Sequence, residues 1–437
     1  MALSLGSPPP AVSRHRPPVE PGLSSTSGIR IPSAAVARPS DARKLAHAAI
    51  PVKRLACEKI TGWNLQSDDV TFQIMPMSVA SRPTWAYRAF LAYLRHAARR
   101  RRTARSGHEP VDQRHALDAL RRITGKPSFP EALSSKQIRQ WIEIVVPGGE
   151  AGTMRPARLY RPRGEVAGLV LFLHGGGFVH CDLVSHHGIC CRLARQSKAM
   201  VLSLDYRLAP EHPFPAAVDD SWAALIWLAE RGRETGRPLA VAGDSAGGNL
   251  AAVLTQRSRD RGGPELAGQL LFYPALSGAL VPSTRTEYGD GYMLTTRVME
   301  WYARQYLTDP AQLHDPRFAP LVAERFESLA PAMIQTAEFD PMRGEGEMYR
   351  DRLRAAGVST VYRMTHGAIH GFLNAYAFMR DGRRAIREGG AFLGICFSKQ
   401  QVADKGRTAG MAQAQPPVEP GLPANPAPTL TEGEVFA

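Results

Sequence analysis

The sequence lacks any run of about 18 consecutive apolar residues, so no membrane-spanning helix is expected. The N-terminus lacks a compact apolar segment after its first charges, and three prolines at residues 8–10 interrupt it, so we predict no secretory signal. Cysteine is scarce, with five residues that show neither metal-binding spacing nor an even disulfide framework. These absences favour reduced thiols, and we predict a cytoplasmic protein.

Acidic residues are also in short supply, with 40 Asp and Glu against 54 Lys and Arg and a net charge of +14. The excess is local, because residues 76–110 hold eight Arg and a single acid, Glu109. The run Arg99–Arg102 could bind lipid head groups or nucleic acid, which makes an anionic-surface binding protein one hypothesis. A solvated helix end explains the same run, and we expect no nucleic-acid partner.

Both ends of the chain are poor in periodic apolar residues. Residues 1–75 and 399–437 are rich in Pro, Ala and polar residues, a composition that buries too little apolar surface to offset chain entropy. We predict a disordered or low-complexity N-terminal extension over 1–75 and a disordered tail over 399–437. Apolar periodicity predicts helices at 84–102 and near 112–123, within an N-terminal cap region that we assign to 76–135.

The catalytic domain is predicted over 136–398, where short apolar runs of strand length alternate with helical patterns. This alternation predicts an α/β fold with a mostly parallel, eight-stranded sheet that helices cover on both faces. The first two runs have no helix between them and predict an antiparallel hairpin at one edge. Residues 277–328 interrupt the alternation and predict a lid. The eight runs lie at 141–146, 157–160, 169–173, 200–204, 239–242, 270–273, 333–336 and 361–364.

A Gly-x-Ser-x-Gly pattern follows the fifth predicted strand and precedes a helical pattern. Its turn is so tight that it requires glycine at both flanks, here Gly243 and Gly247. The pattern predicts Ser245 as a nucleophile at the carboxyl edge of the sheet. The helix dipole there favours developing negative charge.

Three consecutive glycines follow the third predicted strand, in His174-Gly175-Gly176-Gly177-Phe178. Glycines let the backbone approach a ligand and point N–H groups at it. Acyl transfer places charge on a carbonyl oxygen, and we assign its hydrogen-bond donors to the N–H groups of Gly175, Gly176 and Ala246. His174, Gly177 and Asp244 are predicted to support these motifs.

A serine hydroxyl needs a base in contact with it to act at neutral pH. His370 follows the last predicted strand and Asp340 follows the seventh, so both should reach the sheet edge that carries Ser245. The chain order Ser, Asp, His is the one used by α/β hydrolases. We predict His370 as the base and Asp340 as the group that orients it.

Other residues compete for these roles. His366 is an alternative base, and Asp351 and Asp309 are alternative acids, although their predicted positions on helices or the lid favour solvated side chains. His186 and His187 could bind a metal, but no third ligand is apparent, so we predict no metal.

Five segments together resemble the hormone-sensitive-lipase-like esterases, the bacterial family IV of lipolytic enzymes, which is similar to arylacetamide deacetylase. The resemblance covers about residues 83–397 and implies an α/β-hydrolase fold that cleaves small-molecule carboxylic esters with short or medium acyl chains, without a cofactor. It also implies a helical cap that places the 84–102 helix over the active site. The segments are 174–178, 205–216, 243–248, 340–343 and 370–372.

This chain departs from the family at two points. The family usually has an acid where Gly344 stands, so we expect a looser loop, for which Glu345 could compensate. The family often has Gly-Asp-Leu-Asp where this chain has Cys181–Val184, a change expected to alter the mouth of the pocket. An amidase or deacetylase acting on a specific acylated metabolite is the alternative function, because the same triad serves both reactions. A homodimer is kept as a hypothesis.

Overall fold

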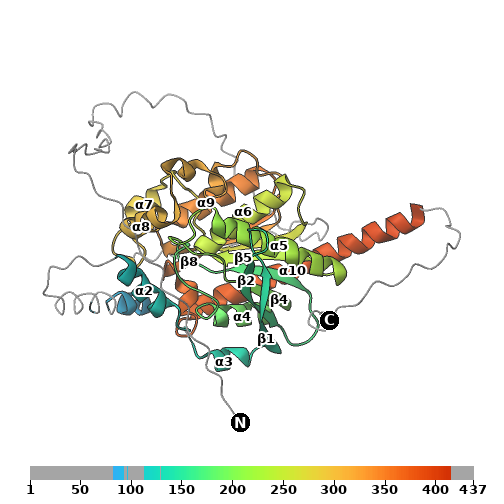
Figure 1. Cartoon of the computed structure of the whole chain (residues 1–437), viewed down its shortest axis with the longest axis horizontal. Helices are drawn as coiled ribbons and strands as arrows, with labels where there is room; N and C mark the ends of the chain where they lie inside the picture. The colour runs from blue at the N-terminus through green and yellow to red at the C-terminus, as the bar shows by residue number, and fades with distance from the viewer. Residues whose placement is uncertain (1–81, 93–95, 97–112, 128, 415–437) are drawn as a thin grey trace, which may run out of the picture. The chain divides into compact units, whose positions relative to one another are not determined.

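The computed structural model describes residues 82–92, 96, 113–127 and 129–414 (Figure 1). Eight strands form one sheet in these residues. They are β1 (Gln140–Pro147), β2 (Met154–Arg161), β3 (Gly168–Leu173), β4 (Ala199–Leu204), β5 (Leu239–Asp244), β6 (Leu266–Phe272), β7 (Ala332–Phe339) and β8 (Thr360–Ile369).

The strand order is β1-β2-β4-β3-β5-β6-β7-β8. β1 and β2 form an antiparallel hairpin at one edge, and β2 is also antiparallel to β4. All pairs from β4 to β8 are parallel. The predicted sheet and its edge hairpin are therefore confirmed.

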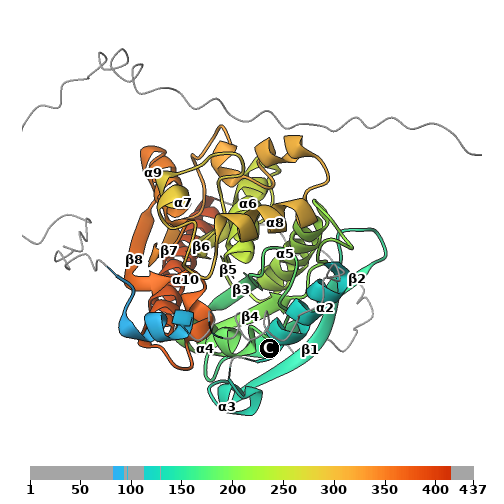
Figure 2. The same cartoon turned by 90° about the vertical axis from the view of Figure 1, so that its left-hand side faces the viewer.

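Helices connect the strands and cover both faces of the sheet. α5, α6 and α9 contact β3, β5 and β7, while α4 and α10 contact each other together with β4 and β6 (Figure 2). The helices are α2 (Gln113–Thr124), α3 (Glu131–Ser135), α4 (His187–Ser197), α5 (Ala216–Glu234), α6 (Ala246–Asp260), α7 (Ser283–Glu287), α8 (Thr296–Tyr306), α9 (Arg343–Ala355) and α10 (Arg380–Ala414), with the 3-10 helices η2 (Pro310–His314), η3 (Pro320–Val322) and η4 (Phe372–Ala375).

The central strands are apolar at every position because both of their faces are buried. In β3, Leu169, Leu171 and Leu173 enter the core on the α5 and α6 side. Val170 and Phe172 enter the core on the α4 and α10 side. Side chains alternate between the faces of a strand, so an uninterrupted apolar run supplies two cores at once.

Helix α10 continues past residue 398, where the tail was predicted to begin, and ends at Ala414. The predicted disorder is therefore wrong for 399–414, and residues 415–437 lie outside the described part. Many residues of the extension are polar, so the pattern of apolar residues did not predict a helix there. Its beginning contacts the rest of the protein, since the Gln401 side chain donates a hydrogen bond to the Ala167 carbonyl at 3.2 Å.

Among the described residues, no helix combines the length and apolarity needed to cross a membrane. The four cysteines in the described part are free thiols, and Cys57 and Arg99–Arg102 lie outside it. Cys190, Cys191 and Cys396 are buried. They behave as small apolar residues of the core, as expected for unpaired cysteine.

Phe397 anchors α10 to the sheet and allows a test of this contact. Its side chain is fully buried, and a Cβ added to Gly168 of β3 would lie 2.7 Å from its ring. We expect Phe397→Ala to lower the free energy of unfolding by about 3–5 kcal/mol, measured by denaturant titration. The control is Val402→Ala on the same helix, whose side chain is 71% exposed and whose loss should cost less than about 0.5 kcal/mol. Equal effects of the two changes would contradict this packing.

Candidate active site

The turn between β5 and α6 places Ser245 at the carboxyl edge of the sheet. Ser245 has φ 53° and ψ −115°, a conformation that non-glycine residues rarely adopt. A Cβ on Gly247 would lie 1.9 Å from the Leu173 carbonyl oxygen, and one on Gly243 would lie 2.2 Å from the Gly247 carbonyl oxygen. Both flanking positions therefore require glycine, as the motif predicts.

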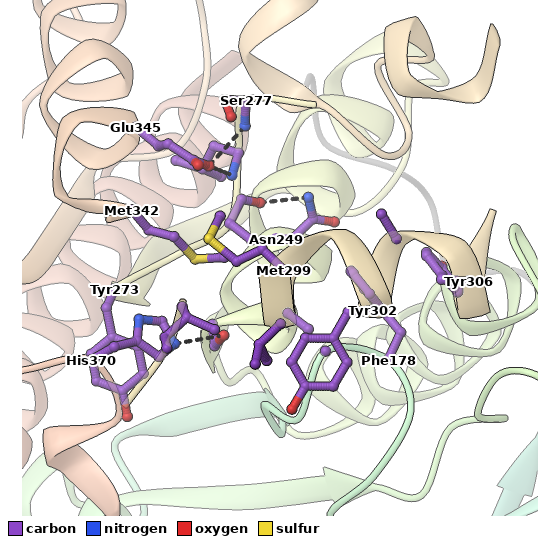
Figure 3. Close-up of a pocket in the computed structure, with 18 of the residues that line it drawn as sticks. Phe178, Asn249, Tyr273, Ser277, Met299, Tyr302, Tyr306, Met342, Glu345 and His370 are labelled. Carbon is purple, nitrogen blue, oxygen red and sulfur yellow. Dashed lines mark hydrogen bonds between the residues drawn. The ribbon is translucent and has the colours of Figure 1, made fainter. Parts of the chain in front are cut away.

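Ser245, His370 and Asp340 meet at this edge. Figure 3 shows the His370 ring in the wall of the adjoining cavity. The Nε2 atom of His370 lies 3.0 Å from the Ser245 Oγ, and its Nδ1 lies 2.8 Å from the Asp340 Oδ2. Asp340 is fully buried, and its Oδ1 accepts a hydrogen bond from the Met342 N–H at 2.8 Å. With Nδ1–H donated to the carboxylate, Nε2 is free to accept the serine proton.

The glycine loop after β3 departs from the predicted donor set. The Gly175 N–H donates to the Asp244 Oδ1 at 2.9 Å, so its predicted role toward an oxyanion is corrected. The physical reason is that Asp244 is buried beneath the loop and its carboxylate needs donors. Gly176, Gly177 and Ala246 line the cavity in front of Ser245, and their N–H groups have no partner within the described residues.

A buried polar cluster supports this loop from behind. Burial, helped by the neighbouring His186, lowers the pKa of His174 to about 4. His174 stacks on Tyr206, with ring centroids 4.3 Å apart, and its carbonyl accepts the Tyr206 hydroxyl at 2.7 Å. Burial opposes ionisation of Asp244, but His186 and the other neighbours hold the pKa of this carboxyl below its usual value. These contacts make the cluster a scaffold for the glycine loop.

A cavity of about 780 Å³ extends from Ser245 and His370 toward α7 and α8. Figure 3 shows side chains on two sides of this cavity. Phe178 and Tyr302 lie on one side, and Met342 and Glu345 lie on the other. Most of the wall comes from residues 276–318, within and beside the predicted lid. The larger apolar and aromatic side chains are Phe178, Tyr273, Leu276, Val281, Met293, Leu294, Val298, Met299, Tyr302, Tyr306, Leu313, Phe318 and Met342.

A family model described as the α/β hydrolase fold matches residues 170–374. The chain is similar to the carboxylic ester hydrolase LipN of Mycobacterium tuberculosis, with 45% identity over 56% of this chain and 68% of LipN. Esterase LipI of the same organism is 41% identical, over 65% of this chain and 87% of LipI. The chain belongs to the α/β-hydrolase family. The structure of a hyperthermophilic esterase from Pyrobaculum calidifontis matches this hydrolase with a TM-score of 0.63 and 37% identity, over 72% of this chain and 98% of that one.

These matches confirm the resemblance to hormone-sensitive-lipase-like esterases. They also show that the protein is an enzyme of the carboxylic ester hydrolase class. One departure from that family is resolved by the structure. Glu345 is buried and accepts the N–H groups of Leu276 at 2.6 Å and Ser277 at 3.0 Å, as well as the Arg285 guanidinium. A Cβ on Gly344 would lie 2.7 Å from a Pro282 side-chain atom, so an acid does not fit there. Glu345 thus ties the loop that follows β6 to the first turn of α9.

The alternative catalytic residues of the hydrolase lie away from Ser245. The Nδ1 atom of His366 is 3.6 Å from a carboxylate oxygen of Glu338. Asp351 pairs with Arg350 at the surface, and Asp309 caps η2. None of these three residues lines the described cavity wall.

The two histidines considered as metal ligands have other partners. The Nε2 atom of His186 lies 3.2 Å from the Asp244 Oδ1. The Nε2 atom of His187 lies 3.0 Å from the Ser135 hydroxyl. Within the described part of the chain, no three His, Cys, Asp or Glu side chains gather as a metal site.

The helix predicted over 84–102 is described only at residues 85–92 and 96. Thr84 donates its N–H to the Gly367 carbonyl at 3.1 Å, and the buried Tyr87 contacts Asp381. The described residues before Gly176 contribute nothing to the cavity wall. The expectation that this helix covers the site is thus corrected for its described part, which packs beside β8 and the start of α10.

His174 makes the stability of the hydrolase depend on pH. Its folded pKa of about 4 lies below the ordinary 6.5, so between these values the unfolded chain binds a proton that the folded chain excludes. The stabilisation is fully present above about pH 6.5 and is lost as the pH falls toward 4, by roughly 3 kcal/mol in total. We expect His174→Gln to flatten this part of the unfolding free energy profile, measured by denaturant titration from pH 4 to 8. Parallel profiles for the two proteins would refute the assignment.

Proposed function

We propose that the protein is a serine esterase that hydrolyses carboxylic esters through Ser245, His370 and Asp340. The observation that supports it is the position of the His370 ring, 3.0 Å from the Ser245 hydroxyl and 2.8 Å from the Asp340 carboxylate. These distances suit proton transfer at Nε2 and a fixed tautomer at Nδ1.

In the first step, the Ser245 Oγ attacks the ester carbonyl while His370 Nε2 takes the hydroxyl proton. The carbonyl oxygen becomes an oxyanion and accepts the N–H groups of Gly176, Gly177 and Ala246. These donors are backbone groups of the loop after β3 and of the first turn of α6, so little reorganisation is needed as charge develops. Asp340 stabilises the imidazolium that forms.

The second half of the reaction uses the same groups. The alcohol leaves with the proton from His370, and Ser245 keeps the acyl group as an ester. His370 then takes a proton from water, which attacks the acyl carbonyl, and the carboxylic acid leaves as Ser245 regains its proton. Each step requires only residues of this chain and water.

The cavity favours small-molecule esters with short to medium acyl chains. Its wall is mainly apolar, and its volume of about 780 Å³ suits a small organic substrate. We assign the predicted lid, residues 277–328, as the element that selects the substrate, because α8 and its neighbours form much of the wall. Cytoplasmic location and homodimer formation stay predictions.

Replacing the nucleophile tests the mechanism. We expect Ser245→Ala to lose at least about 10⁴-fold in kcat on p-nitrophenyl acetate and butyrate, because it removes the hydroxyl that bonds to His370 Nε2. The wild type should hydrolyse these esters faster than the laurate ester or a matched anilide. Circular dichroism checks folding, and Asp351→Asn, an exposed position on α9, serves as the control. Retention of full activity by Ser245→Ala would exclude this mechanism.

A histidine pair tests the identity of the base. His370→Ala should reduce kcat by at least about 10²-fold, since general-base catalysis contributes on this scale. His366→Ala removes a histidine from the same strand region that contacts Glu338 and not Ser245, so its kcat should stay within about twofold. Hydrolysis of p-nitrophenyl butyrate measures both. The reverse ranking of the two variants would show that the base is misassigned.

A further inference from the structure

We propose that Tyr302, on α8, is a positioning residue for the oxyanion donors. Its ring packs on Gly177 and its hydroxyl bonds to His180, so the segment that covers the cavity also holds the glycine loop in its reactive shape. The inference rests on the proposed esterase function and extends it to a residue outside the motifs.

The ring of Tyr302 occupies the space directly above one donor. A Cβ added to Gly177 would lie 2.5 Å from the ring, and Gly177 has a φ of 62°. Any larger residue at 177 would therefore displace the tyrosine. The tight contact restricts how far the Gly177 peptide can rotate, and with it the direction of its N–H.

The hydroxyl of Tyr302 reaches the same loop at a second point. It lies 2.7 Å from the Nε2 of His180. The Gly176 carbonyl accepts the N–H of Val179 at 3.0 Å and that of His180 at 3.1 Å, so His180 belongs to the turn that presents the donors. A Cβ on Gly176 would lie 2.1 Å from the His180 carbonyl oxygen, which shows how closely this turn folds on itself.

The other ring nitrogen of His180 is also engaged. Its Nδ1 lies 3.2 Å from the Sγ of Cys181, which has a φ of 70° and stands where similar esterases often have glycine. Burial, with His174 and His186 nearby, lowers the pKa of His180 to about 4. The neutral ring has one donor and one acceptor nitrogen, and either tautomer completes a chain from Tyr302 to Cys181.

Such a contact matters most when charge develops on the carbonyl oxygen. The donors bind the oxyanion more strongly than the ground-state ester, so a small change in their direction lowers kcat more than it raises KM. A residue that only shaped the substrate cavity would change KM instead. The ratio of these two effects separates positioning from simple packing.

Tyr302→Phe is the direct test, because it keeps the ring on Gly177 and removes the bond to His180. We expect kcat on p-nitrophenyl butyrate to fall about tenfold with KM within about twofold. The affinity for an alkyl trifluoromethyl ketone, which forms an oxyanion adduct with Ser245, should fall by a similar factor. The affinity for the corresponding secondary alcohol, which forms no adduct, should stay unchanged.

Two sets of variants serve as controls, one for a loss of stability and one for the role of His180 as the partner of Tyr302. Tyr362→Phe removes a phenol hydroxyl that also has a 2.7 Å bond, to the Thr336 hydroxyl, but lies outside the described cavity wall. It should lower the melting temperature without changing kcat. His180→Leu should reproduce the effect of Tyr302→Phe, His180→Gln should recover part of it, and the double variant Tyr302→Phe/His180→Leu should lose no more than either single change.

Wild type and Ser245→Ala are measured in the same assays. If Ser245→Ala keeps its activity, the proposed function fails and the inference fails with it. If Ser245→Ala is inactive while Tyr302→Phe has the kcat and ketone affinity of the wild type, the inference alone is wrong. If Tyr302→Phe changes KM without changing kcat, the inference is also wrong, because Tyr302 would then only shape the cavity.

Discussion

The close approach of two backbones is the constraint on which this site depends. Gly247, in the first turn of α6, lies so near the end of β3 that a Cβ there would be 1.9 Å from the Leu173 carbonyl oxygen. The contact brings the nucleophile turn against the loop that follows β3. Ser245, Gly176 and Gly177 therefore line one cavity, although they follow different strands.

Buried carboxylates hold the surrounding loops by a shared physical principle. A buried negative charge is costly unless N–H groups or cations satisfy it, so each carboxylate orders the backbone around it. Asp244 fixes Gly175, and Glu345 fixes the two N–H groups that follow β6. Asp340 accepts the N–H of Met342 while it holds His370. The loops around the site are thus held in place by carboxylates whose oxygen atoms bond to protein groups.

The elements above the sheet edge complete the cavity. In Figure 2, α7 and α8 lie on the same side of the sheet as α6, and side chains of α8 line the cavity that also contains Ser245. A wall contributed by a separate segment lets the substrate preference vary while the sheet keeps the catalytic groups in place. In this chain the same segment also contacts the glycine loop, because the Tyr302 hydroxyl bonds to His180.

The sequence by itself determined the sheet, because buried parallel strands need apolar runs, and the positions of Ser245, Asp340 and His370, because loops after parallel strands meet at one edge. The sequence could not reveal that Asp244 accepts the hydrogen bond of the Gly175 N–H, since that bond joins two loops and depends on their packing. The length of α10 was not predicted for a similar reason, because a polar residue past 398, Gln401, bonds to a segment that is distant in the sequence. Periodicity and tight turns are local properties, whereas hydrogen bonds between distant residues exist only once tertiary structure has formed.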